Sequence, residues 1–109
     1  MILVWAALSG AIAVAAGAFG AHGAEGKAAD WLRTGGQYQL AHALAALIAV
    51  QLRASGAAWL FVGGAALFAG TLYLMALGLP RWLGAITPIG GALLIAGWLW
   101  LAWSAWRGG

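Results

Sequence analysis

The chain has 109 residues, of which 65% are hydrophobic and only 6% are charged. Soluble domains carry charge on about a quarter of their residues, so this composition excludes a soluble domain and indicates an integral membrane protein. The net charge of +3 comes from cations spread singly along the chain, which is typical of anchoring at lipid headgroups and argues against a nucleic-acid partner. The absence of cysteine excludes disulfides, thiolate nucleophiles and sulfur metal sites.

Four long apolar runs divide the sequence, and they cover residues 1–22, 34–52, 57–79 and 83–106. A helix needs about 20 apolar residues to cross the hydrocarbon core of a bilayer, and within lipid it must satisfy its backbone hydrogen bonds internally. We therefore predict an all-α fold: a single transmembrane domain, residues 1–109, built as an antiparallel four-helix bundle. No Lys or Arg precedes the first run, so we expect a permanent span and not a cleaved secretory signal.

Short polar segments separate the apolar runs. The longest, residues 23–33, holds both acids and two of the cations: Glu25, Lys27, Asp30 and Arg33. It is followed by Thr34-Gly35-Gly36-Gln37, which has the spacing of a capping box, so we expect the second span to begin at Thr34.

Pro88 has two interpretations. It lies in the first turn of the fourth helix, where its missing N–H costs nothing, or it kinks a helix that begins near Trp82.

The cations fall on both membrane faces of this topology. Lys27, Arg33 and Arg81 lie on one side, and Arg53 and Arg107 lie on the other. Because orientation follows a clear excess of cations on the cytoplasmic side, the charges leave the orientation open.

Three of the spans carry two glycines seven residues apart, a spacing that puts both on one face of a helix. In lipid, a stripe of small residues lets helix backbones approach closely. We therefore expect these glycines to form packing seams: Gly10 and Gly17, Gly63 and Gly70, and Gly90 and Gly97.

Polar residues recur on the same helical spacing and are expected to face the inside of the bundle. At a rise of 1.5 Å per residue, Tyr73, Thr87 and His42 lie within about 12 Å of the same membrane face, where His22 ends the first span. We therefore expect a polar cluster in one leaflet, made of His22, Tyr38, His42, Tyr73 and Thr87.

Four segments of the chain match a known pattern in order. They are Gly17-Ala18-Phe19-Gly20-Ala21-His22-Gly23, Tyr38-Gln39-Leu40-Ala41-His42-Ala43-Leu44, Phe68-Ala69-Gly70-Thr71-Leu72-Tyr73 and Ile86-Thr87-Pro88-Ile89-Gly90-Gly91. Together they resemble the YgdD/YwdK family of small, four-helix proteins of the bacterial inner membrane, whose function is unknown. The resemblance covers about residues 9–98 and departs from the family at Ala69 and Thr71, where serine is frequent. It implies a multi-pass protein of the bacterial inner (plasma) membrane with both termini in the cytoplasm, but no activity.

The polar cluster has two interpretations. It fixes the register of the helices, or it binds a lipid headgroup, a small molecule or a partner helix, with Lys27, Arg33 or Arg81 for an anionic group. We therefore predict a non-enzymatic membrane protein whose expected partner is membrane lipid. The alternative is a transporter or channel, expected as a homo-oligomer because one bundle of this size has little room for a pore.

Other functions find less support in the residues. A proton-coupled exporter needs a carboxylate inside a span, whereas Glu25 and Asp30 lie in a loop, and a fluoride-type channel would use interior amides, yet the chain has no asparagine. His22 and His42 are residue types that bind metal ions or haem, but two histidines are too few for a closed zinc site. We expect them to bond to neighbouring helices, with no metal and no cofactor. Ser9 is expected near the opposite membrane face from both histidines, so no nucleophile with its base is visible.

Overall fold

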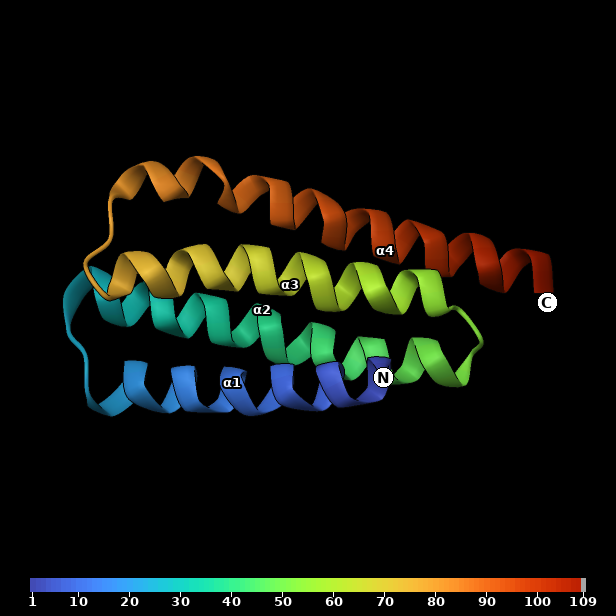
Figure 1. Ribbon diagram of the computed structural model, residues 1–109, viewed down its shortest axis with the longest axis horizontal. Coiled ribbons are helices and arrows are strands. Elements are labelled where there is room, and N and C mark those ends of the chain that lie inside the picture. The colour runs from blue at the N-terminus through green and yellow to red at the C-terminus, as the bar shows by residue number, and fades with distance from the viewer. Residues whose placement is uncertain (109) are drawn as a thin grey trace.

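The computed structural model describes residues 1–108, in which four long helices account for most of the chain: α1 (Ile2–His22), α2 (Gly26–Gln51), α3 (Ser55–Ala76) and α4 (Thr87–Gly108). A short 3-10 helix, η1 (Arg81–Ala85), precedes α4. Consecutive long helices run antiparallel, and both chain termini lie at the same end of the molecule (Figure 1). The predicted all-α architecture is confirmed.

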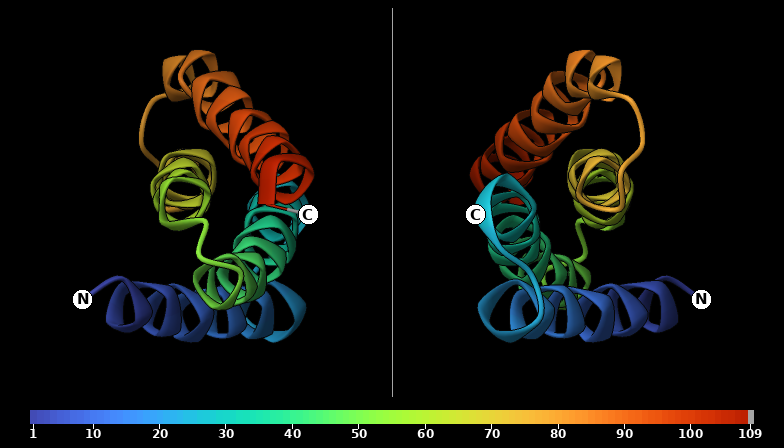
Figure 2. Two further views of the ribbon diagram at one scale, coloured as in Figure 1. Left: turned by 90° about the vertical axis from the view of Figure 1, so that its right-hand side faces the viewer. Right: turned by 90° about the vertical axis from the view of Figure 1, so that its left-hand side faces the viewer.

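The helices pack in chain order. α1 packs against α2, α2 against α3 and α3 against α4, whereas α1 meets α3 only lightly. Viewed along the long axis, α1 lies at one edge of the molecule and α4 at the other, and α4 runs obliquely from above α3 toward the side on which α2 lies without closing onto α1 (Figure 2). We call the end with both termini and the α2–α3 turn the terminal end, and the opposite end, with η1, the Arg81 end.

Three segments are long and apolar enough to cross a membrane: Ile2–His22, Ser55–Ala76 and Arg81–Gly108. α2 is not among them, because its first turns are charged and its middle holds Gln39 and His42. It is also the helix that packs between α1 and α3, and its Gln39 and His42 side chains are buried there. The crossing of the membrane by α2, over residues 34–52, stays a prediction.

α2 begins earlier than the sequence pattern predicts. It starts at Gly26 and runs without a break through Thr34, so the helix start expected at Thr34 is wrong. The preceding residues already favour a helix, because Leu32 is buried and Arg33 forms an ion pair with Asp30, at 3.3 Å, one turn away. The capping-box pattern therefore lies in a helix interior, where its side chains have no exposed N–H groups to satisfy.

The start of α4 decides between the two interpretations of Pro88. η1 ends at Ala85 and α4 begins at Thr87, so Pro88 lies in the first turn of α4. The N–H groups in the first turn of a helix have no acceptor within the helix, so the N–H that proline lacks costs no hydrogen bond there. Pro88 is therefore a helix-start residue of α4.

Several glycines lie where two helix backbones approach closely. A Cβ added to Gly90 would lie 2.8 Å from the carbonyl oxygen of Gly64, and one added to Gly97 would lie 2.7 Å from a ring carbon of α3. At the α1–α2 contact, a Cβ on Gly36 would lie 3.2 Å from the amide nitrogen of Gly17. Only glycine permits these approaches.

The seam expected on α3 is turned away from the other helices. A Cβ added to Gly63 or Gly70 would meet no atom within 4 Å, and Gly64 makes the close contact with α4 instead. One residue along a helix is a rotation of roughly 100°, so α3 presents the face next to the expected one. On α1, a Cβ added to Gly10 would make an ordinary contact, 3.8 Å from Cβ of Ala43, and one added to Gly17 would meet no atom within 4 Å, so the packing does not require glycine at either position of that expected seam.

Candidate functional site

One hydrogen-bonded network crosses α1, α2 and α3 through Gln39. The Tyr73 hydroxyl donates to Oε1 of Gln39 at 2.7 Å, and Nε2 of Gln39 donates to Oγ of Ser9 at 3.1 Å. Gln39 is only 4% exposed. Gly35 leaves room for the Tyr73 ring, since a Cβ there would lie 2.7 Å from it. Gln39 therefore ties three helices together.

A second network joins α2 to α4 through the His42 imidazole. Nε1 of Trp98 donates to Nε2 of His42 at 2.9 Å, and Nδ1 of His42 lies 2.6 Å from the carbonyl oxygen of Tyr38. Because an indole N–H can only donate, Nε2 is the acceptor, and Nδ1 carries the proton that it donates to Tyr38. Both ring nitrogens of His42 are thus occupied, and a metal or haem would have to displace Trp98 to bind Nε2.

A third contact ties the start of α4 to α3. The hydroxyls of Thr71 and Thr87 bond to each other, and Thr71 also donates toward the carbonyl oxygen of Leu67 at 3.0 Å. Thr87 is therefore held by α3 and does not join His42.

The five residues expected to cluster are thus divided. Tyr38 and His42 share one side of α2, whereas Tyr73 and Thr87 belong to separate networks. His22 lies exposed in the last turn of α1, and its side chain joins none of these networks within residues 1–108.

Residues that the sequence interpretation missed complete the networks: Ser9, Gln39, Thr71 and Trp98. Ser9 was expected to stand apart from the histidines near the opposite face, which is wrong, because it bonds to Gln39 only one turn of α2 before His42. A signal was present, since a glutamine in the middle of a span must find a partner in another helix. In residues 1–108, no three metal-ligating side chains come together.

A groove of about 410 Å³ runs between α2 and α4, and we call it the α2–α4 groove. It is lined by Tyr38, His42, Phe68, Gly91, Leu94, Ile95 and Trp98. Pockets for small molecules measure about 300–1,000 Å³, so this volume suits a ligand. The rings of Tyr38 and Phe68 pack at 4.8 Å between centroids.

Tyr38 is the residue of the groove with an unused polar group. The Tyr38 side chain is 47% exposed. Within residues 1–108, the side chains of α2 that form hydrogen bonds are Arg33, Gln39 and His42, and the Tyr38 hydroxyl forms none. A tyrosine hydroxyl within a membrane normally has a partner. The hydroxyl is therefore available to a molecule in the groove.

Two contacts link α2 to the segment formed by η1 and α4, one at the α2–α4 groove and one beyond its lining residues. Toward the terminal end, the Trp98–His42 hydrogen bond spans the groove. At the Arg81 end, the Arg81 guanidinium lies 5.6 Å from the centroid of the Trp31 ring. Trp31 precedes Tyr38 by two helical turns on the same face of α2, about 10 Å along the axis. Trp31 and the groove residue Phe68 also pack against one buried cluster, made of Leu72, Met75 and Leu83.

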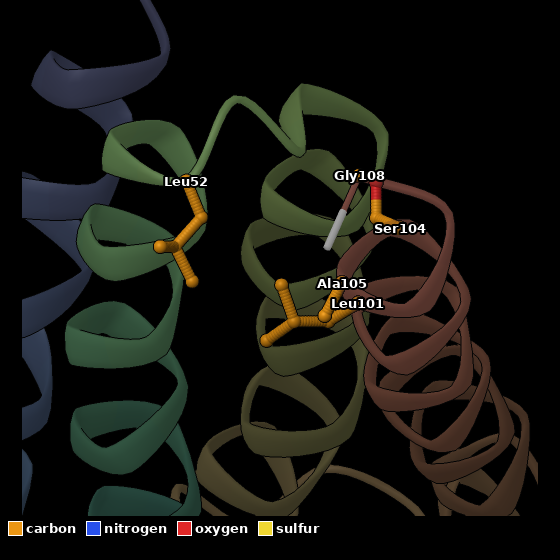
Figure 3. Close-up of a pocket in the computed structure, with 5 residues that line it drawn as sticks. All are labelled: Leu52, Leu101, Ser104, Ala105 and Gly108. Carbon is orange, nitrogen blue, oxygen red and sulfur yellow. The ribbon is translucent and has the colours of Figure 1, made fainter.

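A smaller hollow of about 260 Å³ lies at the terminal end, between the ends of α2 and α4. Its lining residues are Leu52, Leu101, Ser104, Ala105 and Gly108 (Figure 3). Ser104 supplies the only side-chain hydroxyl there, and no second polar side chain lies beside it among these residues. This hollow has no constellation of reactive groups.

The helices and their polar networks together define a class of protein. Long apolar helices enclose polar side chains that bond to one another, which is how polar residues are accommodated within lipid. The fold is that of a helical membrane protein. The chain belongs to the family described as "Protein of unknown function (DUF423)", which matches residues 16–91.

Curated relatives agree with this assignment. The UPF0382 membrane protein SH2409 of Staphylococcus haemolyticus is 41% identical over 98% of this chain and 96% of its own length. The membrane protein YwdK of Bacillus subtilis is 40% identical over 91% of this chain and 90% of its own. The inner membrane protein YgdD of Escherichia coli is 40% identical over 89% and 82%. The resemblance expected from the motifs is confirmed, and no solved structure matches the chain.

Proposed function

We propose that this protein binds a membrane lipid, with one acyl chain in the α2–α4 groove and an ester carbonyl bonded to the Tyr38 hydroxyl. The observation that carries the proposal is the groove itself, where one unpaired hydroxyl stands among aromatic and aliphatic walls. A lipid chain suits such walls, and a lipid ester offers the acceptor that Tyr38 lacks.

The other polar groups of the molecule support a binding role over catalysis. Ser9 and Tyr73 bond to Gln39, which is not a base, and both nitrogens of His42 are used within the protein. A catalytic nucleophile would need a base within hydrogen-bonding reach. The polar networks instead hold the helices that form the groove, so the proposed function is non-enzymatic.

Native mass spectrometry tests the proposal on the protein released from membranes into mild detergent. Gly91 lines the groove, and a Cβ there would lie 3.7 Å from the Phe68 ring, so Gly91→Leu fills the groove. Gly63→Leu is the matched control, because its side chain enters open space. We expect the wild type and Gly63→Leu to retain one lipid and Gly91→Leu to retain none. Equal lipid retention by all three proteins would contradict the proposal.

The alternative is a small homo-oligomeric transporter or channel. It is favoured by the open face of α3, where Gly63 and Gly70 would let a second copy approach closely. The same spectra distinguish the two functions. Oligomers that disappear in Gly63→Leu support the alternative, whereas monomers that carry a lipid support lipid binding.

A further inference from the structure

We propose that Arg81 binds the phosphate of the lipid in the α2–α4 groove, which makes the ligand a glycerophospholipid and not a neutral glyceride. This inference rests on the proposed lipid binding and names the ligand class of the same site. It assigns a role to the cation–π contact between Arg81 and Trp31.

The order of polar groups along the groove matches the order of groups in a phospholipid. Trp31 and the Arg81 guanidinium above it stand about 10 Å from Tyr38 along the axis of α2, toward the Arg81 end. Helical side chains lean toward the N-terminus of their helix, and because this applies to Trp31 and Tyr38 alike, the two rings keep this separation along α2. A lipid whose ester carbonyl meets Tyr38 therefore carries its phosphate toward Arg81.

The guanidinium of Arg81 is free to bind an anion. Among residues 1–108 the ion pair joins Arg33 to Asp30, and Arg81 has no carboxylate partner. The guanidinium carbon lies 5.6 Å from the centroid of the Trp31 ring, and a cation–π contact of this kind takes up none of the N–H groups as hydrogen-bond donors. Those N–H groups form a planar fork that matches two phosphate oxygens, which an ammonium cannot do.

The surrounding charges favour an anion as well. The Arg81 end holds three cations, Lys27, Arg33 and Arg81, against two acids, Glu25 and Asp30, which gives a net charge of +1. With Asp30 paired to Arg33, Arg81 is left with no carboxylate partner in the ion pair found at this end within residues 1–108. A lipid headgroup with net negative charge is attracted to such a surface.

Two lipids with identical acyl chains separate the phosphate contact from the groove contact. Phosphatidylglycerol and diacylglycerol are titrated into the detergent-solubilised protein, and bound masses are counted in native spectra. We expect the wild type to prefer phosphatidylglycerol by about tenfold, the scale of one charge-assisted hydrogen-bonded contact. Arg81→Gln should bind both lipids equally, and Arg81→Lys should recover part of the preference.

Lys27→Gln is the matched control, since it removes a cation from the same end and leaves the Arg81 guanidinium over the Trp31 ring. An unchanged preference in Arg81→Gln, or an equal loss in Lys27→Gln, would overturn the phosphate assignment. The proposed function fails separately, if neither lipid binds or if Gly91→Leu leaves the binding of both unchanged. If the wild type binds both lipids equally and Gly91→Leu binds neither, the phosphate contact is wrong while the groove remains the lipid site.

Discussion

Trp98 of α4 donates its indole N–H to Nε2 of His42 on α2, at 2.9 Å, and this bond joins two helices that do not otherwise pack along each other. Phe61 of α3 lies beneath both rings, with centroids 5.6 Å from His42 and 4.8 Å from Trp98. The bond therefore fixes the imidazole tautomer and sets the width of the α2–α4 groove at one end.

Removing the donor of this bond should destabilise the protein. Trp98→Phe keeps an aromatic ring but leaves Nε2 of His42 unpaired in a buried position, which costs about 1–3 kcal/mol. We expect a lower thermal unfolding midpoint in detergent, followed by circular dichroism. Trp106→Phe, at a side chain that is 83% exposed, is the control and should unfold like the wild type. Equal midpoints for both variants would show that the bond contributes nothing.

The two tyrosines should respond differently to loss of the hydroxyl. Tyr73→Phe leaves Oε1 of Gln39 without its donor, so we expect a loss of about 0.6–1.7 kcal/mol of stability, the range for hydrogen bonds between membrane helices. Tyr38→Phe removes a hydroxyl that the protein does not use, so stability should be unchanged while lipid retention falls. Thermal unfolding and native mass spectrometry on both variants check the pair. A stability loss in Tyr38→Phe that equals that in Tyr73→Phe would refute the distinction.

Gly90→Ala and Gly70→Ala should have opposite effects. The new Cβ of Gly90→Ala meets the carbonyl of Gly64 at 2.8 Å, which forces α3 and α4 apart and costs about 1–3 kcal/mol. At Gly70 the new Cβ enters open space, so helix propensity alone applies and stability rises by up to about 1 kcal/mol. Thermal unfolding measures both changes. If both substitutions raised the stability, or both lowered it, the packing of Gly90 against α3 and the open surroundings of Gly70 would be contradicted.

The lengths of the apolar runs were enough to predict four helices, because each run must be helical in lipid. The rotation of each helix was not predictable in the same way. Gly63 and Gly64 are adjacent, and the seven-residue spacing selects Gly63, but the burial of Phe61, Ala65 and Ala69 turns Gly64 toward α4. A pattern within one helix cannot include the shapes of its neighbours.

The polar site shows the same limit. Tyr38 and His42 were found because they lie one turn apart on a single helix. Their partner Trp98 lies 56 residues from His42, and Gln39 is separated from Ser9 by 30 residues. Those pairings depend on the order in which the helices pack, which the sequence pattern does not specify.

The central claim is that a lipid chain occupies the α2–α4 groove. It is tested most directly with a phospholipid that carries a photoreactive diazirine on its acyl chain. The protein is irradiated in bilayers and the labelled residues are mapped by mass spectrometry. We predict adducts concentrated on Phe68, Leu94 and Ile95 in the groove. Adducts spread equally over exposed residues of α1 such as Val4 and Val14, a helix that contributes nothing to the lining of the groove, would contradict the account.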